Sequence, residues 1–349
     1  MTLRRPAPAF LLTAIAATAV ILPWAVDGTP EHRDQPRAED TRLVEQPLAG
    51  VGGGVTIREI SQQSPFSMVA LTGDDLTGTS ARVRAKKADG SWGPWYDAET
   101  LRSNASDDAG PGRRGTDPVF VGNTTAVQIA VTRPANAPVT VAPPAKPDEH
   151  GLGYRPVNVE QPIGQNLSAI LISPPQAPID MQFTPPTAVM PAGQPPAIIS
   201  RAQWGAGDQG ACGNPVYDDG IRAAVVHHTA GSNDYTPEDS AAIVRAIYAY
   251  HTQTLGWCDI AYNALVDKFG QVFEGRAGGI DKPVEGSHTG GFNRNTFGVA
   301  MLGNFDDVRP TEIQLRMVGR LLGWRLGLDH VNPLGSVSLT SAGGEYTHF

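Results

Sequence analysis

The chain has 349 residues, enough for two folded domains and the segments that connect them. Its formal net charge is −8 and it contains no long run of Lys and Arg, which excludes nucleic acid as the main partner, because phosphate binding needs a concentrated basic surface. Glycine occurs 39 times and proline 30 times, a content that excludes a single all-helical protein, a coiled coil or a repeat solenoid.

Residues 1–27 are typical of an export signal. Two arginines precede an uncharged apolar run over residues 9–26, and a basic start before an apolar stretch is how a signal peptide is built. The small residues at 17–19 and the region near Ala25 both fit a cleavage site. The alternative is an uncleaved membrane anchor, because the run is just long enough to span a bilayer. We predict the cleaved signal, a secreted or cell-wall-associated protein, and no stable membrane partner beyond that signal.

Two segments with different compositions and hydrophobic patterns follow. Residues 28–50 are polar and turn-rich with no hydrophobic period, so we predict that they are disordered. Residues 51–172 favour a small all-β domain, because apolar and polar residues alternate over 81–86 and again over 127–131. The apolar stretch Leu167–Ile172 is interpreted as a last strand of that domain.

A group of aromatic residues lies in the predicted β domain, beside the turn at Asp89 and Gly90. Trp92, Trp95 and Tyr96 are placed as a sugar-stacking platform would be, but aromatic residues beside a hairpin more often pack in the core or at the edge of a sheet. A carbohydrate-binding role for this domain is therefore one hypothesis, supported by these side chains and the strand composition alone.

Residues 173–196 are rich in proline and predict a semi-rigid linker, because proline cannot donate to a helix or a sheet ladder. Strand-like and helix-like segments then interleave over residues 197–349, which predicts an α/β domain. The expected elements are a strand over 223–226, a helix opened by Thr236–Asp239, a hairpin over 261–274, a strand over 297–302 and a helix over 311–326.

Four of the eight histidines fall in this predicted α/β domain between its first strand and its last helix. His227 and His228 end the first strand, and His251 continues the apolar stripe of the first helix, so it faces inward. His288 lies in a glycine-rich loop, residues 286–291, where the backbone can approach a ligand closely. A lone histidine is usually a hydrogen-bonded core or surface residue, so spacing alone does not establish a site.

The chain contains two cysteines, Cys212 and Cys258. An even count in an exported protein favours one disulfide, which would stabilise the fold by roughly 3–4 kcal/mol. The other interpretation is that one of the two cysteines binds a metal ion.

Four motifs now carry a resemblance to the peptidoglycan-recognition-protein amidases. Ser-Arg-Ala-Gln-Trp-Gly-Ala at 200–206 resembles the entry segment of that family, and Val-Val-His-His-Thr-Ala at 225–230 its metal-bearing strand. Gly-Trp-Cys-Asp-Ile-Ala-Tyr-Asn-Ala-Leu-Val at 256–266 resembles its central hairpin, and Gly-Ser-His-Thr-Gly-Gly-Phe-Asn at 286–293 its substrate loop. The resemblance covers roughly residues 197–328 and is closest to secreted bacterial members with an N-terminal β-rich region.

The resemblance implies a mixed central sheet flanked by helices and hydrolysis, with Zn²⁺, of the peptidoglycan amide between N-acetylmuramic acid and L-alanine. It implies that His227 is a zinc ligand and that Tyr262 orients water or stabilises the developing oxyanion. The residues implied for the muropeptide groove are His251, His288 and Asn293. His228 is interpreted as structural support. For Tyr262, the alternative role is packing of the tyrosine ring.

The chain departs from the family pattern after its last predicted helix. The family's other two zinc ligands, a His and a Cys, come from a segment that follows this helix, and no such segment precedes Phe349. Neither His348 nor Cys258 is a convincing substitute. We interpret the domain as C-terminally incomplete and predict a zinc amidase; the alternative is a peptidoglycan-binding protein without catalytic activity.

Overall fold

The computed structural model describes residues 36–101, 114–141, 166–185 and 193–341. These residues all belong to one unit, which spans residues 36–349. The predicted export signal and the first part of the segment predicted to be disordered lie outside the described residues. In the described part of the chain, no helix is both long enough and apolar enough to cross a membrane.

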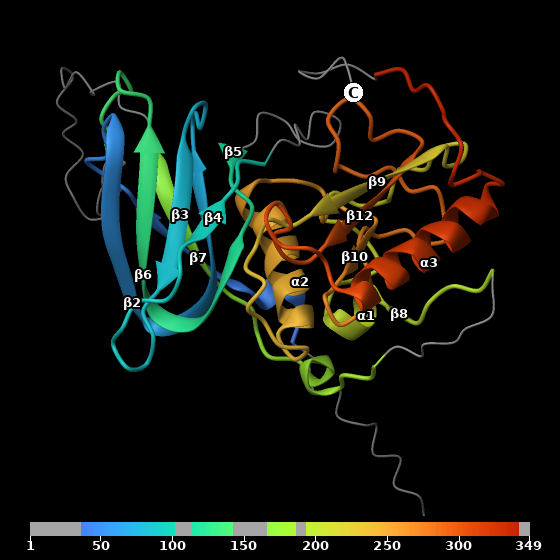
Figure 1. Ribbon diagram of the computed structural model, residues 1–349, viewed down its shortest axis with the longest axis horizontal. Coiled ribbons are helices and arrows are strands. Elements are labelled where there is room, and N and C mark those ends of the chain that lie inside the picture. Colours follow the sequence, from blue (N-terminus) through green and yellow to red (C-terminus); the bar gives the residue numbers. More distant parts are fainter. Residues whose placement is uncertain (1–35, 102–113, 142–165, 186–192, 342–349) are drawn as a thin grey trace, which may run out of the picture. The chain divides into compact units, whose positions relative to one another are not determined.

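The described residues between 36 and 173, here called the β lobe, form one antiparallel sheet in the order β1-β7-β2-β6-β3-β4, with β5 paired to β2 (Figure 1). The β lobe thus confirms the all-β fold that alternation predicted. Its elements are the 3₁₀ turn η1 (Ala38–Asp40) and the strands β1 (Arg42–Pro47), β2 (Gly54–Gly73), β3 (Ser80–Ala85), β4 (Tyr96–Ala98), β5 (Arg114–Gly115), β6 (Val119–Arg133) and β7 (Leu167–Ser173).

Two long strands allow this sheet to fold around its own core. The first half of β2 pairs with the end of β6, whereas its second half pairs with β7, and the β2–β6 register shifts after Ser61. Such irregularities bend a strand. Val83 and Ile129 on one part of the sheet therefore share a buried cluster with Leu71 and Leu171 on the other.

The prediction that residues 28–50 are disordered is wrong for the part that the structure describes. Strand β1 pairs antiparallel with β7 over six residues, from Arg42↔Ser173 to Pro47↔Ser168. Leu43 and Val44 pack against opposite hydrophobic clusters of the unit. A polar strand with few apolar residues gives little local signal, and here it is ordered by a partner that lies far away in the sequence.

The segment predicted to be a linker is also bound, in part, to the α/β lobe (residues 198–341). Its turn η2 (Pro178–Met181) presents Asp180, whose carboxylate accepts a hydrogen bond at 2.5 Å from the fully buried Arg245. Residues 186–192 of this predicted segment lie outside the described residues. Where it is described, the segment is held by a buried ion pair in addition to the stiffness of its prolines.

Residues 198–341, here called the α/β lobe, contain a mixed five-stranded sheet in the order β8-β11-β10-β12-β9 (Figure 1). Only β10 and β11 pair antiparallel; the other three pairs are parallel. The elements are β8 (Ile198–Ile199), α1 (Arg201–Trp204), β9 (Ala223–His228), α2 (Ser240–Ala249), η3 (Tyr250–Thr254), β10 (Ala264–Val266), β11 (Val272–Glu274), β12 (Thr296–Met301) and α3 (Glu312–Leu328).

The two longer helices cover opposite faces of this sheet (Figure 1). Leu265, Phe273 and Ala300 share a cluster with the apolar residues of α2, whereas Val266 and Val299 share one with those of α3. This division follows from the strand period, because successive side chains point to opposite faces of a sheet. The α/β fold with a mixed sheet between helices is as predicted.

Helix α2 begins later than its sequence indicates, and its last turn is not α-helical. Thr236–Asp239 form a turn in which the Asp239 carboxylate accepts hydrogen bonds from the Thr236 amide and hydroxyl, and the helix starts at Ser240. Its last turn, η3, is a π-helix that contains His251. Elsewhere in the lobe, Cys212 and Cys258 form a disulfide, which joins the loop after α1 to the segment after η3.

Candidate functional site

Two histidines from separate parts of the α/β lobe meet at the end of β9. His227 pairs with Ala300 across the sheet, and its Nε2 lies 3.1 Å from Nδ1 of His288, in the glycine-rich loop after β11. The Thr289 hydroxyl lies 2.9 Å from the same His288 nitrogen and 3.3 Å from His227 Nε2. These three side chains, here called the histidine cluster, therefore form one hydrogen-bonded group.

His288 reaches this position because glycines leave room for its ring. A Cβ atom on Gly298 of β12 would lie 2.3 Å from the His288 ring, and one on Gly286 would lie 2.5 Å from it. The ring thus rests directly on the backbone of the sheet, an approach that requires residues without a side chain. Gly286 and Gly298 therefore leave the room that the histidine ring needs.

Burial keeps both histidines neutral. It lowers the pKa of His227 to about 4, with a smaller contribution from the neighbouring His228. Burial also lowers the pKa of His288 well below its usual range, and the nearby His227 and Arg276 add to this effect. Each ring therefore offers one donor and one acceptor nitrogen near pH 7, which is the form that binds amides, hydroxyls or a metal ion.

Tyr262 completes the group from the segment before β10. Its ring centroid lies 5.6 Å from that of His227, and the residue is 6% exposed. Burial, and to a smaller extent the nearby Asp117 carboxyl of the β lobe, raises the pKa of the phenol well above its usual value. Tyr262 therefore stays protonated and is a hydrogen-bond donor at the site.

His251 lies behind Tyr262 and has no contact with solvent. Its ring centroid is 4.5 Å from that of Trp257 and 6.3 Å from that of Tyr262. Its Nδ1 accepts a hydrogen bond from the Ala261 amide, which leaves the proton on Nε2. The inward orientation expected from the helical stripe is thus observed, and contact between His251 and a ligand remains a prediction that requires the site to open.

Asn293 is fully buried and supports the loop that carries His288. Its amide oxygen accepts a hydrogen bond of 2.8 Å from the Thr289 backbone. Arg276 supports the same loop by donating to the Ser287 hydroxyl at 3.0 Å, and Asn263 ties the hairpin to β12 through the Gly298 amide. Thr289, Arg276 and Asn263 lie in or beside the quoted motifs, and their supporting roles were not predicted from the sequence.

His228 lies beside a second group, composed of Glu99 and Asp306. One ligand atom from each of the three residues lies within 4.8 Å of the others, the geometry of a three-donor metal site. The Phe305 amide, however, donates to His228 Nδ1, which places the proton on Nε2, 3.6 Å from the Glu99 carboxylate. In this tautomer Nε2 carries the proton, so it has no free lone pair with which to ligate a metal ion. The geometry agrees with structural support as the role of His228.

The zinc ion implied by the resemblance was tested against the histidine cluster. A catalytic zinc site uses three protein ligands from His, Cys, Asp or Glu. The described residues at the cluster supply two such donors, His227 Nε2 and His288 Nδ1, and the Thr289 hydroxyl, which is not a ligand of this type. The donors present among the described residues therefore do not make a complete zinc site.

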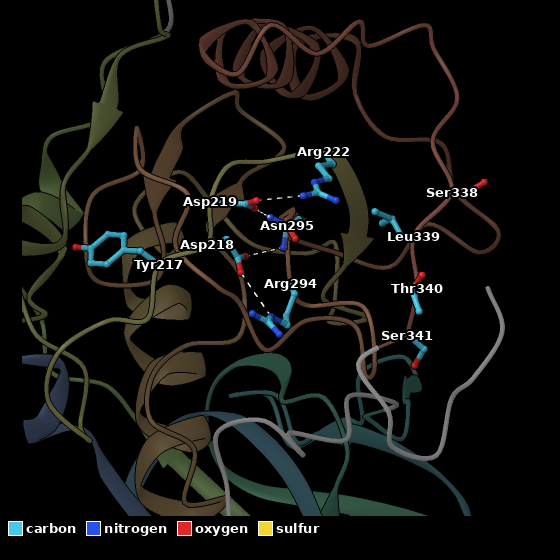
Figure 2. Close-up of a pocket in the computed structure, with 10 residues that line it drawn as sticks. All are labelled: Tyr217, Asp218, Asp219, Arg222, Arg294, Asn295, Ser338, Leu339, Thr340 and Ser341. Carbon is cyan, nitrogen blue, oxygen red and sulfur yellow. Dashed lines mark hydrogen bonds and ion pairs between the residues drawn. The ribbon is translucent and has the colours of Figure 1, made fainter.

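A cavity of about 610 Å³ lies elsewhere on the α/β lobe and is lined by residues 217–219, 222, 294–295 and 338–341 (Figure 2). Asn295 organises its wall, because its backbone amide donates to Asp218 and its side chain donates to Asp219. None of the predicted site residues lines this cavity. The structure thus separates the cavity from the histidine cluster.

Two family models match the chain, one in each lobe. Residues 31–149 match the model described as Rv3811 N-terminal galactose-binding domain-like, and residues 217–340 match the model described as N-acetylmuramoyl-L-alanine amidase. The second match includes His227, Tyr262 and His288.

Curated relatives match the α/β lobe. Peptidoglycan recognition protein 1 of Mus musculus is 37% identical over 129 residues, which are 36% of this chain and 66% of that protein. Peptidoglycan-recognition protein SC1a/b of Drosophila simulans is 35% identical over 118 residues, which are 33% of this chain and 60% of that protein. The chain thus spans less than two thirds of the length of either relative.

Solved structures give similar partial matches. The ectodomain complex of peptidoglycan recognition proteins LCa and LCx, bound to tracheal cytotoxin, matches at 31% identity with a TM-score of 0.35, over 38% of this chain and 78% of that one. Human PGRP-IBETAC, in complex with glycosamyl muramyl pentapeptide, matches at 26% identity with a TM-score of 0.35, over 39% of this chain and 79% of that one. On its family model and its curated relatives, the α/β lobe belongs to the N-acetylmuramoyl-L-alanine amidase family of the peptidoglycan recognition proteins.

Proposed function

We propose that the α/β lobe binds the muropeptide unit of peptidoglycan at the histidine cluster. The observation that carries this proposal is that His227, His288 and Tyr262, three neutral hydrogen-bonding side chains from separate motifs, converge at the end of one strand. Neutral donors and acceptors suit the amides and hydroxyls of a peptide joined to a sugar. Of the three, His227 is the most accessible to solvent.

A second candidate function is zinc-dependent hydrolysis of the amide between N-acetylmuramic acid and L-alanine. It is supported by the membership of the lobe in the amidase family and by the protonated phenol of Tyr262 beside His227. Such a donor can hold the carbonyl oxygen as negative charge develops on it, an effect worth roughly 3–4 kcal/mol. The described residues supply two of the three ligands that a catalytic zinc needs, so this candidate requires a further ligand beyond them.

We also propose that the protein acts outside the cytoplasm, where peptidoglycan is accessible. The disulfide between Cys212 and Cys258 supports this location, because such bonds persist in oxidising compartments. The apolar run at residues 9–26 agrees with export and lies outside the described residues.

Calorimetric titration of the chain with a soluble disaccharide–pentapeptide tests binding. Replacing His227→Asn should weaken the affinity about three- to tenfold, the effect of losing one or two neutral hydrogen bonds. His330→Asn is the matched control, because His330 is exposed and lies outside the cluster, and it should bind as the wild type does. Equal affinity of the wild type and His227→Asn would contradict this placement of the ligand.

Chromatography of the same muropeptide after incubation with the chain tests hydrolysis, with zinc added or with a chelator. If the second candidate is correct, free stem peptide accumulates only with zinc, and Tyr262→Phe slows its release without loss of binding. If the muropeptide binds but stays intact under both conditions, the chain as it stands is a binding protein.

A further inference from the structure

A stripe of basic side chains lies on the outer face of the β lobe. Arg82 and Arg84 of β3, and Lys86 directly after it, alternate with residues that point into the core. Arg82 and Lys86 are exposed, and Arg84 is half-buried. These three residues, here called the basic stripe, span about 13 Å along the strand.

Two tryptophans interleave with the basic stripe. The Arg84 guanidinium carbon lies 5.4 Å from the ring centroid of Trp92 and 4.4 Å from that of Trp95. Arg82 lies 5.8 Å from the Trp95 ring, and Lys86 lies 5.6 Å from the Trp92 ring. Cations within about 6 Å of a ring are attracted to its face, so these contacts hold charges and rings in one ordered surface.

The charges of the basic stripe are not cancelled by ion pairs. Within the part of the chain that the structure describes, none of the three basic side chains forms a salt bridge. Arg84 instead donates twice to the Gln128 side chain, at 2.7 and 3.0 Å, which fixes its orientation. The nearest acid by strand register is Asp97, opposite Arg82. Among the described residues, the chain thus carries three basic side chains without ion pairs on one strand, although its net charge is −8.

We propose that the basic stripe and its two tryptophans bind a linear polyuronate glycan, a polymer of sugar rings that each carry a carboxylate. Such a ligand offers a ring for stacking and a carboxylate for pairing in every repeat, matching a surface where rings and cations alternate. Guanidinium groups bind carboxylates well because they can donate two parallel hydrogen bonds. The disulfide in the α/β lobe indicates an oxidising compartment, where glycans are more available than nucleic acid.

The test is binding of the full chain to immobilised polygalacturonate, with neutral dextran as the uncharged control. The double variant R82Q/K86Q should bind polygalacturonate roughly tenfold or more weakly at low salt, since two exposed ionic contacts are lost. The control R309Q/R316Q removes the same charge from exposed positions in the α/β lobe and should bind as the wild type does. W95L should also weaken binding, in a chain whose thermal unfolding shows that it is folded.

The proposal would be overturned if the wild type did not bind polygalacturonate, if R82Q/K86Q bound it equally well, or if the wild type bound dextran equally well. Tighter binding to anionic phospholipid vesicles or to a single-stranded oligonucleotide would assign the surface to another class of partner and would also overturn it. Muropeptide titration of R82Q/K86Q keeps this result separate from the proposed function, because the histidine cluster is unchanged in that variant.

Discussion

At the scale of single residues, His251 has the inward orientation that the sequence predicts, but one of its ring nitrogens lacks a hydrogen-bond partner among the described residues. The helical stripe indicates that it faces inward, and the structure buries it completely. Its Nδ1 accepts from Ala261, and its Nε2 has no hydrogen-bond partner among the described residues. A buried polar group without a partner costs roughly 1–3 kcal/mol.

The burial of His251 predicts a pH dependence of stability. Its pKa is lowered to about 3 in the folded protein, because the ring is desolvated, and is near 6.5 in the unfolded chain. Above about pH 6.5 the ring is neutral in both the folded and the unfolded chain, so it adds no pH-dependent term to the stability. As the pH falls below that value, the unfolded chain takes up a proton that the folded protein does not, so stability is lost until about pH 3. At pH 5 the loss is about 2 kcal/mol from this residue.

Urea unfolding at pH 7 and pH 5 measures this loss of stability. Burial also lowers the pKa of His227 and His288, so these two residues add to the loss. His251→Gln should therefore lose less stability between the two pH values than the wild type does. His330→Asn, which changes an exposed histidine, should keep the wild-type difference. An unchanged difference in His251→Gln would show that the ring is solvated.

At the scale of elements, local signals explain where helices begin when a side chain supplies the cap. Thr311 was expected to open the last helix, and its hydroxyl accepts a hydrogen bond of 3.2 Å from the Gln314 amide while donating to the Lys268 carbonyl. At α2 the same kind of signal was misleading, because the Asp239 carboxylate closes a separate turn onto Thr236 and delays the helix. Cap motifs thus indicate a helix start within a few residues.

Thr311→Ala should lower the free energy of unfolding by about 1–2 kcal/mol, because it removes both bonds of the hydroxyl. Thr311→Ser retains the hydroxyl and is the matched control. Denaturant unfolding distinguishes the two variants, and identical midpoints for the alanine and serine variants would contradict the capping role.

The disulfide is an element-scale constraint that closes a sequence separation of 46 residues. Replacing both cysteines by serine should lower the free energy of unfolding by roughly 3–4 kcal/mol, mainly because the unfolded chain gains freedom. Thermal unfolding measures the loss, and dithiothreitol should shift the wild-type midpoint toward that of the variant and leave the variant unchanged. A wild-type midpoint insensitive to the reductant would contradict the expected contribution.

At the scale of the whole unit, one hydrophobic cluster includes residues from both lobes. Met68 and Phe120 of the β lobe share it with Tyr235 and Tyr262 of the α/β lobe. The Tyr250 hydroxyl donates to the Leu71 carbonyl at 3.2 Å, which ties η3 to β2. A shared core of this kind makes the two lobes unfold together.

Tyr250→Phe should lower the stability of both lobes by about 0.5–1.5 kcal/mol, because the Leu71 carbonyl loses one of its two donors, the other being the Thr116 amide, while the ring packing is kept. Hydrogen exchange resolves the two lobes separately. The expected result is a common decrease in the protection of core amides in β6 and β12. A decrease confined to the α/β lobe would show that the lobes open independently.

Particular elements show which predictions are reliable from sequence. The apolar strands β6, β9 and β12 were found from their patterns, because side-chain burial imposes a period on the residues themselves. Strand β1 was missed because it is ordered by β7, about 125 residues away, and nothing in its own residues records that partner. The contact of Asp180 with Arg245 was missed for the same reason.

The amino-acid sequence by itself determined the two fold classes, the identity of the histidines and tyrosine that form the cluster, and the resemblance to a known family, because these depend on local patterns and motifs. Only the tertiary structure decided that His227 faces His288, that His251 is sealed from solvent, and that Arg82, Arg84 and Lys86 interleave with Trp92 and Trp95. Distances between residues remote in sequence are set by packing and register of the whole unit, so they follow only from the folded chain.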